Sequence, residues 1–353
     1  MLYQNDIWNQ DIDRLLEEVL DLQPLSGSRI LITGAAGLIC SSLVDILVRF
    51  NDTRDGRIRV LACGRSEETV KKRFASLLGR EDFSFVYYDA AKGNNCFPEA
   101  ADYVIHGASP AYPAAVMKQP VETLLSNVTG MAELLAYARK SGSRKALYIS
   151  SSEVYGQKSS LKPFDIQEYG YVDILNPRNS YSVGKRAAES LCVAYGHEYG
   201  LDTVIARPGH IYGPTASVQD SRVSSVWPYD VAKGKDIVMK SDGSQLRSYC
   251  YTLDCASALL KILVDGISGQ AYNISNPDSV ISIRQLAEIL ADVGGVQLQR
   301  EQASSEEKKA FNPMQNSSLD ASALLALGWK GCFTAEEGLA HTLAILKGIV
   351  GMR

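Results

Sequence analysis

Between residues 28 and 213, short apolar segments alternate with longer amphipathic ones, and few folds accommodate this order. The apolar segments have the length of strands, whereas the others repeat apolar residues at helical spacing. Six strands are expected, at "RILITG", "RIRVLACG", "FSFVYYDA", "ADYVIHGAS", "KALYISSSEVYG" and "DTVIARPGHIYGP". Strict alternation predicts an α/β fold, a Rossmann-type doubly wound parallel sheet with helices on both faces. Ligands of such sheets bind at the carboxyl ends of the strands.

The segments on either side of this region predict two further parts. Residues 1–27 form an N-terminal helical extension, with apolar residues at helical spacing over 7–22. Residues 28–213 are expected to form one domain around this sheet. From 214 to 353 the segments are shorter and rich in Pro, Gly and Ser, which predicts mainly a smaller substrate-binding lobe. Residues 304–309 are expected to form a polar surface loop.

Composition argues against several classes of protein. The 353 residues include 36 basic and 40 acidic ones without a basic cluster, so neither a nucleic-acid nor a membrane surface is expected. The seven cysteines form no CxxC pair, which predicts free thiols and no metal site. The N-terminus lacks the order of a signal peptide, and no apolar run reaches about eighteen residues. These features predict a cytoplasmic protein.

The segment "TGAAGLIC" follows the first expected strand and opens a helix, the context in which a glycine motif binds a dinucleotide. Gly34 permits the tight turn, and Gly37 lets the backbone approach a pyrophosphate at the helix N-terminus. The third position of the motif, usually Gly or Ala, is Cys40. The residues expected to contact the cofactor here are Gly34, Ala36, Gly37, Leu38 and Ile39.

The end of the second strand bears on the choice between NAD and NADP. The acidic residue that would hold the ribose 2′-hydroxyl is absent from "LACGRSEE", and Arg65 stands where a guanidinium can pair with a 2′-phosphate. This favours NADP over NAD. Asp89 is expected near the adenine amino group, and Ala108, in "HGAS", beside the cofactor's ribose and phosphates.

Tyr181 and Lys185 lie four residues apart on one face of an expected helix. A tyrosine is a poor base at neutral pH, but an adjacent ammonium and a positive nicotinamide stabilise its phenolate. With the glycine loop and a serine-rich strand end, this pair predicts redox chemistry on an alcohol. Residues 28–213 are therefore expected to form an NAD(P)-binding domain that also carries the catalytic residues.

In this order, "TGAAGLIC", "SSSEVYG", "YSVGK" and "RPGHIYGP" resemble the extended short-chain dehydrogenase/reductase family of nucleotide-sugar epimerases, dehydratases and decarboxylases. The resemblance covers residues 28–330 and is most specific to the UDP-glucuronate decarboxylases. It implies a tightly bound NAD or NADP, a nucleotide-sugar substrate and a homodimer formed through two helices of each subunit.

The resemblance also implies roles for individual residues. Tyr181 is the base, Lys185 its activator, and Ser151 positions the substrate hydroxyl. The residues that it places at the substrate are Ser109, Ser152, His210, Arg222 and Arg247.

Glu153 bears on the step after the oxidation at C4. Epimerases of the family usually have a small or neutral residue there, whereas dehydratases and decarboxylases have glutamate. Many 4,6-dehydratases also carry an aspartate acid where this chain has Ser152, and decarboxylation needs no such acid. Decarboxylation of a nucleotide-linked hexuronate is therefore favoured, with a 4,6-dehydratase and a 4-epimerase or 4-ketoreductase as the alternatives.

Three departures leave the identity of the sugar open. His210 replaces the usual asparagine, and a second phosphate-binding arginine expected near residue 316 is missing. The acidic pair of the decarboxylases between the Tyr and the Lys is Ser182 and Val183 here.

Overall fold

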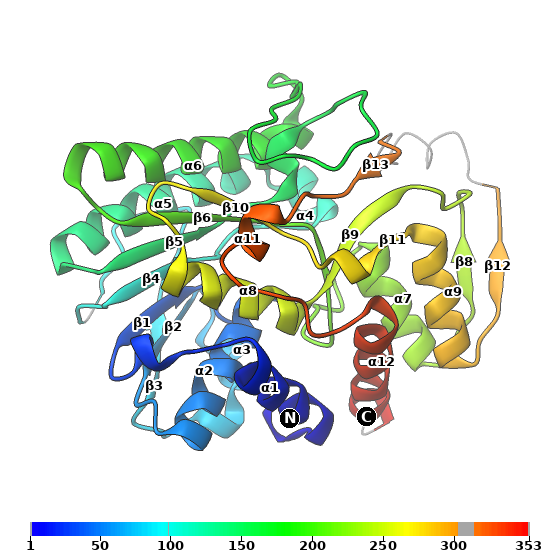
Figure 1. The fold of residues 1–353 in the computed structure, drawn as a ribbon, viewed down its shortest axis with the longest axis horizontal. Helices are drawn as coiled ribbons and strands as arrows, with labels where there is room; N and C mark the ends of the chain where they lie inside the picture. Colours follow the sequence, from blue (N-terminus) through cyan, green and yellow to red (C-terminus); the bar gives the residue numbers. More distant parts are fainter. Residues whose placement is uncertain (1, 98, 303–313, 352–353) are drawn as a thin grey trace.

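The computed structural model describes residues 2–97, 99–302 and 314–351. The polar segment at 304–309 lies outside this range. Within it, a seven-stranded sheet forms the centre of the molecule, in the order β10-β6-β5-β4-β1-β2-β3 (Figure 1). Every neighbouring pair is parallel. The strands are β1 (Arg29–Thr33), β2 (Arg59–Gly64), β3 (Phe83–Tyr87), β4 (Tyr103–His106), β5 (Lys145–Ile149), β6 (Thr203–Pro208) and β10 (Ala271–Ile274). The order reverses between β1 and β4, which confirms the doubly wound fold.

Helices cover both faces of this sheet. Helices α5 (Pro120–Ser141) and α6 (Ser180–Tyr199) lie together on one face (Figure 1). On the other face lie α2 (Cys40–Arg54), α3 (Glu67–Arg73) and α8 (Thr252–Asp265). Helices α5 and α6 end where the sequence predicts, because Gly142 and Gly200 take the left-handed conformation at their C-caps.

Two expected strands are shorter than predicted. The fifth ends at Ile149, and the following residues form the 3-10 turn η4 (Ser152–Tyr155), in which Ser151 Oγ accepts a hydrogen bond from the Glu153 amide at 3.2 Å. The sixth divides at Gly209 into β6 and β7 (His210–Tyr212), which belong to different sheets. A Cβ at Gly209 would lie 2.6 Å from the Ser248 carbonyl oxygen, so the crossing requires glycine.

The rest of the chain builds smaller sheets beside the main one. Strands β7, β9 (Leu246–Tyr251), β11 (Val280–Ser282) and β13 (Asn316–Ser317) form one, and β8 (Ile237–Met239) pairs with β12 (Leu298–Arg300). Their helices are α7 (Val223–Ala232), α9 (Ile283–Gly294), α11 (Ser322–Leu325) and α12 (Ala335–Gly351). Strand β10 and helix α8, although they follow residue 214, belong to the main sheet and its helical layer.

The remaining helical segments are short, except for the N-terminal helix. They are α1 (Asp6–Glu18), α4 (Pro113–Lys118) and the 3-10 turns η1 (Leu2–Gln4), η2 (Gln23–Leu25), η3 (Ala75–Leu77), η5 (Pro177–Asn179) and η6 (Pro277–Ser279). No helix among the described residues is both long and apolar enough to cross a membrane. All seven cysteines are unpaired, and the described residues contain no cluster of metal-ligating side chains.

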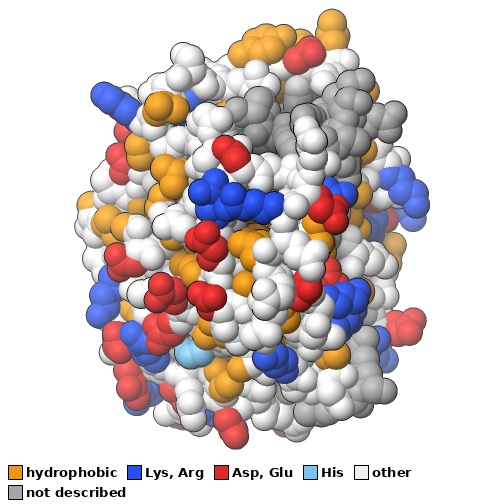
Figure 2. Space-filling view, turned by 90° about the vertical axis from the view of Figure 1, so that its right-hand side faces the viewer, with side chains coloured by type: hydrophobic (Ala, Val, Ile, Leu, Met, Phe, Trp, Pro, Cys, Tyr) orange, Lys and Arg blue, Asp and Glu red, His pale blue; other side chains and the backbone are white. Residues whose placement is uncertain are grey.

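The face shown in Figure 2 carries acidic, basic and apolar side chains side by side, and neither sign of charge forms a continuous field over it. Ion pairs at the surface of the protein include Lys235–Asp230, whose charged atoms are 3.2 Å apart. Such pairs are largely exposed and contribute little to stability.

The N-terminal helix α1 joins two distant parts of the chain. Trp8 is fully buried, and its indole N–H donates to Asp45 Oδ2 of α2 at 2.9 Å. On the other side, Asp11 contacts the His341 ring of α12 at 2.9 Å. The helix therefore bridges the dinucleotide-binding layer and the C-terminal helix.

Replacing Trp8 with Ala is expected to lower the free energy of unfolding by about 3–5 kcal/mol, because a large buried side chain leaves a cavity. Trp8→Phe is the matched control. It keeps most of the packing, and Asp45 keeps Arg73 at 2.5 Å as a partner, so the loss should be about 1–2 kcal/mol. Equilibrium denaturation measures both, and equal losses would show that packing of α1 contributes little.

Candidate active site

A large cleft lies over the carboxyl ends of the parallel strands, where a doubly wound sheet binds its ligands. Its volume is about 1570 Å³, larger than the roughly 300–1,000 Å³ of a site for one small ligand, so a dinucleotide and a second ligand fit together. The structure places every residue predicted for the site on its lining. They are Gly34, Ala36, Gly37, Leu38, Ile39, Arg65, Asp89, Ala108, Ser109, Ser151, Ser152, Glu153, Tyr181, Lys185, His210, Arg222 and Arg247.

The glycine loop after β1 lies directly against the loop after β4. Gly34 has a φ of +68°, and a Cβ there would come within 2.9 Å of the Gly107 backbone. A Cβ on Gly107 would in turn lie 2.3 Å from the Cys40 sulfur. The glycine at 107 thus makes room for the cysteine in the third position of the motif, so both loops can approach a pyrophosphate with their backbones.

His106 connects these two loops through hydrogen bonds. It is buried, and burial lowers its pKa to about 3, so the ring is neutral. Its Nε2 faces the Ser126 carbonyl oxygen at 3.3 Å and must donate there, which leaves Nδ1 to accept from the Thr33 hydroxyl at 2.7 Å. The Thr33 oxygen then accepts from the amides of Gly107 and Ala108. Hydrogen bonds between protein groups therefore hold the two loops against each other.

The outer end of the cleft holds the residues expected at the adenosine. The Arg65 guanidinium pairs with Glu122 of α5, a partner that the sequence does not predict. Asp89 is nearly buried, and its Oδ1 accepts from the Ala91 amide at 3.1 Å. Further in, Asn127 of α5 donates to Ser109 Oγ at 2.9 Å. The loops, the helix N-terminus and these polar groups fit a nicotinamide dinucleotide.

Lys185 reaches from α6 to the end of β5. Its ammonium donates to the Ile149 carbonyl oxygen at 2.7 Å and lies 4.7 Å from the Tyr148 ring and 5.5 Å from the Tyr181 ring. Burial lowers the pKa of Lys185 to about 7, while the nearby Glu189 opposes this shift.

Tyr181 is a phenol in this environment. Burial raises its pKa to about 12 and the Glu153 carboxylate adds to the increase, whereas a hydrogen bond with Ser151 and the Arg222 guanidinium oppose it. A base at this position therefore needs further positive charge next to the ring, which a protonated Lys185 and an oxidised nicotinamide would supply.

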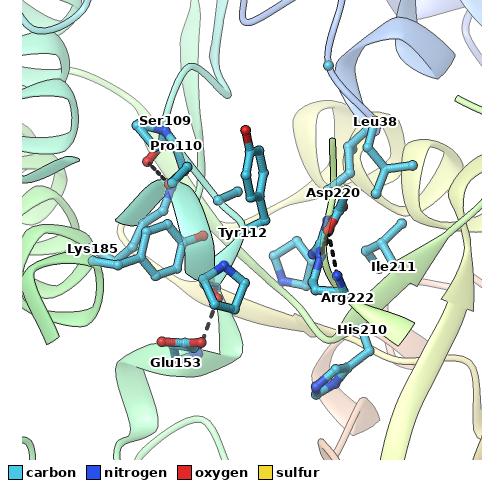
Figure 3. Close-up of a pocket in the computed structure, with 18 of the residues that line it drawn as sticks. Leu38, Ser109, Pro110, Tyr112, Glu153, Lys185, His210, Ile211, Asp220 and Arg222 are labelled. Atoms are coloured by element: carbon cyan, nitrogen blue, oxygen red, sulfur yellow. Dashed lines mark hydrogen bonds and ion pairs between the residues drawn. The ribbon is translucent and has the colours of Figure 1, made fainter. Parts of the chain in front are cut away.

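Glu153 lies in η4, at the wall of the cleft (Figure 3). It is close enough to Tyr181 for its charge to raise the pKa of that residue. Its Oε2 accepts from the Ser182 hydroxyl at 3.2 Å and lies 3.4 Å from Arg178 Nη1. Arg178 and Ser182 flank Tyr181 in the sequence, and their closeness to the motif is the one signal that could have identified them as site residues. The carboxylate is 40% exposed, so a ligand in the cleft can reach it.

On the opposite wall, Arg222 and His210 lie across the cleft from Glu153 and Lys185 (Figure 3). Arg222 pairs with the buried Asp220, with its Nε 3.0 Å from Oδ1. Arg247 is buried, and its Nη1 donates to the carbonyl oxygens of Leu246 and Met314. Among the described residues no carboxylate lies within ion-pair distance of Arg247, so an anionic ligand would balance its charge.

His210 lies between these arginines as a neutral ring. Burial lowers its pKa to about 3, and the charges of Arg247 and Arg222 add to the decrease. Its Nδ1 is buried and has no hydrogen-bond partner among the described residues.

A buried ion pair supports the site from beneath. Glu189, one turn after Lys185, accepts from Arg207 at 2.9 and 2.6 Å and from the Ser150 hydroxyl at 2.6 Å. Arg207 also donates to the Tyr155 hydroxyl at 3.0 Å, which holds the far end of η4. This pair fixes the turn that carries Ser151 and Glu153 against α6, and no motif in the sequence indicates it.

Residues 30–275 match the NAD dependent epimerase/dehydratase family. The chain is 30% identical over 317 residues to UDP-glucuronic acid decarboxylase 1 of Xenopus tropicalis. The aligned residues make up 89% of this chain and 71% of that protein. It is 31% identical over 314 residues to UDP-glucuronic acid decarboxylase 6 of Arabidopsis thaliana, and the aligned residues make up 89% of this chain and 87% of that protein.

Among solved structures, the fold resembles a mutant UDP-glucuronic acid 4-epimerase of Bacillus cereus, in complex with NAD and a fluorinated UDP-sugar. The TM-score is 0.77 at 22% identity, with 91% of this chain and 99% of that chain covered. It also resembles dTDP-glucose 4,6-dehydratase of Bacillus anthracis, in complex with NAD, with a TM-score of 0.72 at 19% identity over 90% and 96%. At this level of identity these likenesses concern the fold.

Proposed function

Because this chain belongs to the NAD dependent epimerase/dehydratase family, we propose that it decarboxylates a nucleotide-linked hexuronate, such as UDP-glucuronate, after oxidising C4 of the sugar. It is an NAD(P)-dependent nucleotide-sugar enzyme. The reaction for which the curated relatives are named supports this proposal, and the cleft has room for both a dinucleotide and a nucleotide sugar.

The first step is an oxidation in which Tyr181 takes the proton of the C4 hydroxyl while Ser151 positions that hydroxyl. The nicotinamide cofactor, when bound between the glycine loop and the 107–109 loop, supplies the hydride acceptor and later the donor. Lys185, anchored on the Ile149 carbonyl, supplies positive charge that stabilises the phenolate.

The second step uses the ketone at C4. A carboxylate at C6 is then β to the ketone, so the C5–C6 bond breaks, carbon dioxide leaves and the electron pair remains at C5 as an enolate. A proton taken from water and passed to C5 by Glu153 completes this step, and reduction of the ketone with return of the Tyr181 proton restores the alcohol. Glu153 is the group that we assign to C5.

The position of Glu153 carries this proposal. It lies on the cleft wall beside Tyr181, close enough for its charge to raise the pKa of that residue, and Ser182 and Arg178 hold its carboxylate. A 4-epimerase needs no acid or base at C5, since its ketone is only rotated and reduced again. A 4,6-dehydratase remains the second candidate, because the same carboxylate can remove the C5 proton and expel a C6 hydroxyl.

Mass spectrometry of the products from a panel of UDP-, dTDP-, GDP- and CDP-linked sugars tests the proposal. Loss of carbon dioxide from a hexuronate is the expected result. Loss of water from a hexose would identify a dehydratase, and an isomer of unchanged mass an epimerase.

For the cofactor we propose a preference for NADP that rests on Arg65. A 2′-phosphate would compete with Glu122 for this guanidinium. Replacing Arg65 with Ala should weaken NADP binding roughly tenfold or more, since charge-assisted hydrogen bonds are lost, and leave NAD binding nearly unchanged. Glu122→Gln should strengthen NADP binding, because a competing negative charge is removed. Calorimetric titration measures both, and NAD alone extracted from the purified protein would contradict the preference.

We also propose a homodimer that forms through α5 and α6. Both helices present apolar side chains to solvent, among them Val121, 70% exposed, Leu125 and Val193. Light scattering at micromolar concentration should therefore give twice the mass of the chain. Val121→Glu together with Val193→Glu should yield monomers, whereas a wild-type monomer would refute the dimer.

A further inference from the structure

Arg178 lies in a fixed position at the rim of the cleft. It belongs to η5, where its amide donates to Asn176 Oδ1 at 3.0 Å and the neighbouring Asn179 donates to the Asp173 carbonyl oxygen at 2.9 Å. These bonds fix the backbone from which the side chain extends. The guanidinium lines the cleft and is 43% exposed.

The contacts of Arg178 differ from those of the other arginines near the site. Arg222 forms a close pair with Asp220, and Arg207 one with Glu189. Arg186 donates to the carbonyl oxygens of Val154 and Gly170. In contrast, the side chain of Arg178 makes one long contact among the described residues, 3.4 Å from a single nitrogen to Glu153 Oε2. The rest of its donor fork remains available to a ligand.

The chemistry proposed above places C5 and C6 of the sugar next to Glu153. A carboxylate at C6 would then put a second negative charge beside the first, which is unfavourable in a cleft partly shielded from water. A guanidinium between two carboxylates removes this repulsion, and its planar fork matches a carboxylate with two parallel hydrogen bonds. A C6 hydroxymethyl group would gain far less from the same contact.

From this geometry we propose that Arg178 is the residue that selects a hexuronate, by binding the C6 carboxylate of the sugar while it neutralises Glu153. This inference rests on the proposed function, because it assumes that C5 and C6 lie at Glu153. Selection of the substrate class would then depend on one side chain that is not among Ser151, Tyr181 and Lys185.

The test measures binding rather than turnover, in a Tyr181→Phe background in which the substrate persists. Calorimetric titration with UDP-glucuronate and with UDP-glucose gives the two affinities for the parent and each variant. The parent should bind UDP-glucuronate more tightly. Arg178→Gln should weaken that binding roughly ten- to a hundredfold, as expected for loss of hydrogen bonds between charged groups, and change UDP-glucose binding by less than about twofold.

Three further variants sharpen the result. Arg178→Lys keeps the charge but not the fork and should retain part of the preference. Glu153→Gln should strengthen UDP-glucuronate binding, because it removes the repulsion and frees Arg178. Arg54→Gln is the matched control, because it removes the same charge from α2, outside the cleft, and it should bind both sugars as the parent does. The unfolding midpoints of Arg54→Gln and Arg178→Gln show whether each variant is folded.

The inference is overturned if the parent shows no preference between the two sugars, including the case in which it binds neither. It is also overturned if Arg178→Gln leaves the preference intact or weakens both sugars equally. These outcomes are separate from those of the proposed function. If the protein that retains Tyr181 releases carbon dioxide but binding shows no preference, only the role of Arg178 is rejected. If binding favours UDP-glucuronate but no carbon dioxide is released, only the proposed decarboxylation is rejected.

Discussion

Replacing Tyr181 with Phe is expected to abolish both cofactor reduction and product formation. The substitution removes the phenol that we propose takes the C4 proton, and loss of a general base lowers the rate by roughly two to four decades. The ring is nearly buried and its packing is kept, so the fold should not change. The assay follows reduced nicotinamide by absorbance and product by mass spectrometry, with a nucleotide sugar that the parent accepts.

Tyr199→Phe provides the matched control, because it deletes the same hydroxyl from the exposed end of the same helix. It should retain the parental rate. Substantial turnover by Tyr181→Phe would show that another group is the base.

The pH dependence of hydride transfer follows from the same residue. Burial raises the pKa of Tyr181 to about 12, and the base acts only after it loses its proton. The rate should therefore rise as the pH is raised across the neutral range, because a larger fraction of the phenol is ionised. As the pH is lowered, the phenol becomes protonated and the rate should fall. The positive charge of bound oxidised cofactor shifts the midpoint downward, so the apparent pKa should lie below that of the protein alone. Lys185 adds to this effect only while it is protonated, and burial lowers its pKa to about 7.

Replacing Glu153 with Gln is expected to separate the oxidation at C4 from the later chemistry at C5. The amide keeps the size of the side chain but cannot exchange a proton with C5. Hydride transfer should remain measurable, while product formation falls by roughly two decades or more, the range of a lost general acid or base. Reduced cofactor and a 4-keto sugar should then accumulate together, which absorbance and mass spectrometry detect in one reaction.

Glu288→Gln, at an exposed position of α9, makes the same chemical change outside the cleft and should leave both steps unaltered. Parental turnover by Glu153→Gln with the same product would assign the glutamate a structural role. A 4-epimerase or 4-ketoreductase would then be the better description of the enzyme.

The fold was predictable because its determinants are local. Each strand of the main sheet is an apolar run of a few residues, and α5 and α6 end at Gly142 and Gly200, which alone take the left-handed conformation there without strain. The two errors in the expected strands occur at Ile149 and Gly209. After Ile149 the chain becomes polar, and Ser151 caps a turn there. After Gly209 the sequence remains β-like, but a close approach to Ser248 redirects the chain.

The main residues of the candidate site were also predictable, because motif spacing brings them to one edge of the sheet. Ser151 follows β5, and Tyr181 and Lys185 share one face of the next helix. Their placement on one cleft follows from parallel strands whose carboxyl ends meet at the same edge.

The surroundings of those residues were decided only by the tertiary structure. Nothing in the sequence joins Arg65 to Glu122, Ser109 to Asn127, or His106 to Thr33, although each contact alters the groups that the cofactor meets. The same holds for Arg178 beside Glu153 and for the neutral His210 between two arginines. Periodicity and spacing report on neighbours along the chain, whereas burial, charge and hydrogen bonding depend on residues that only packing brings together.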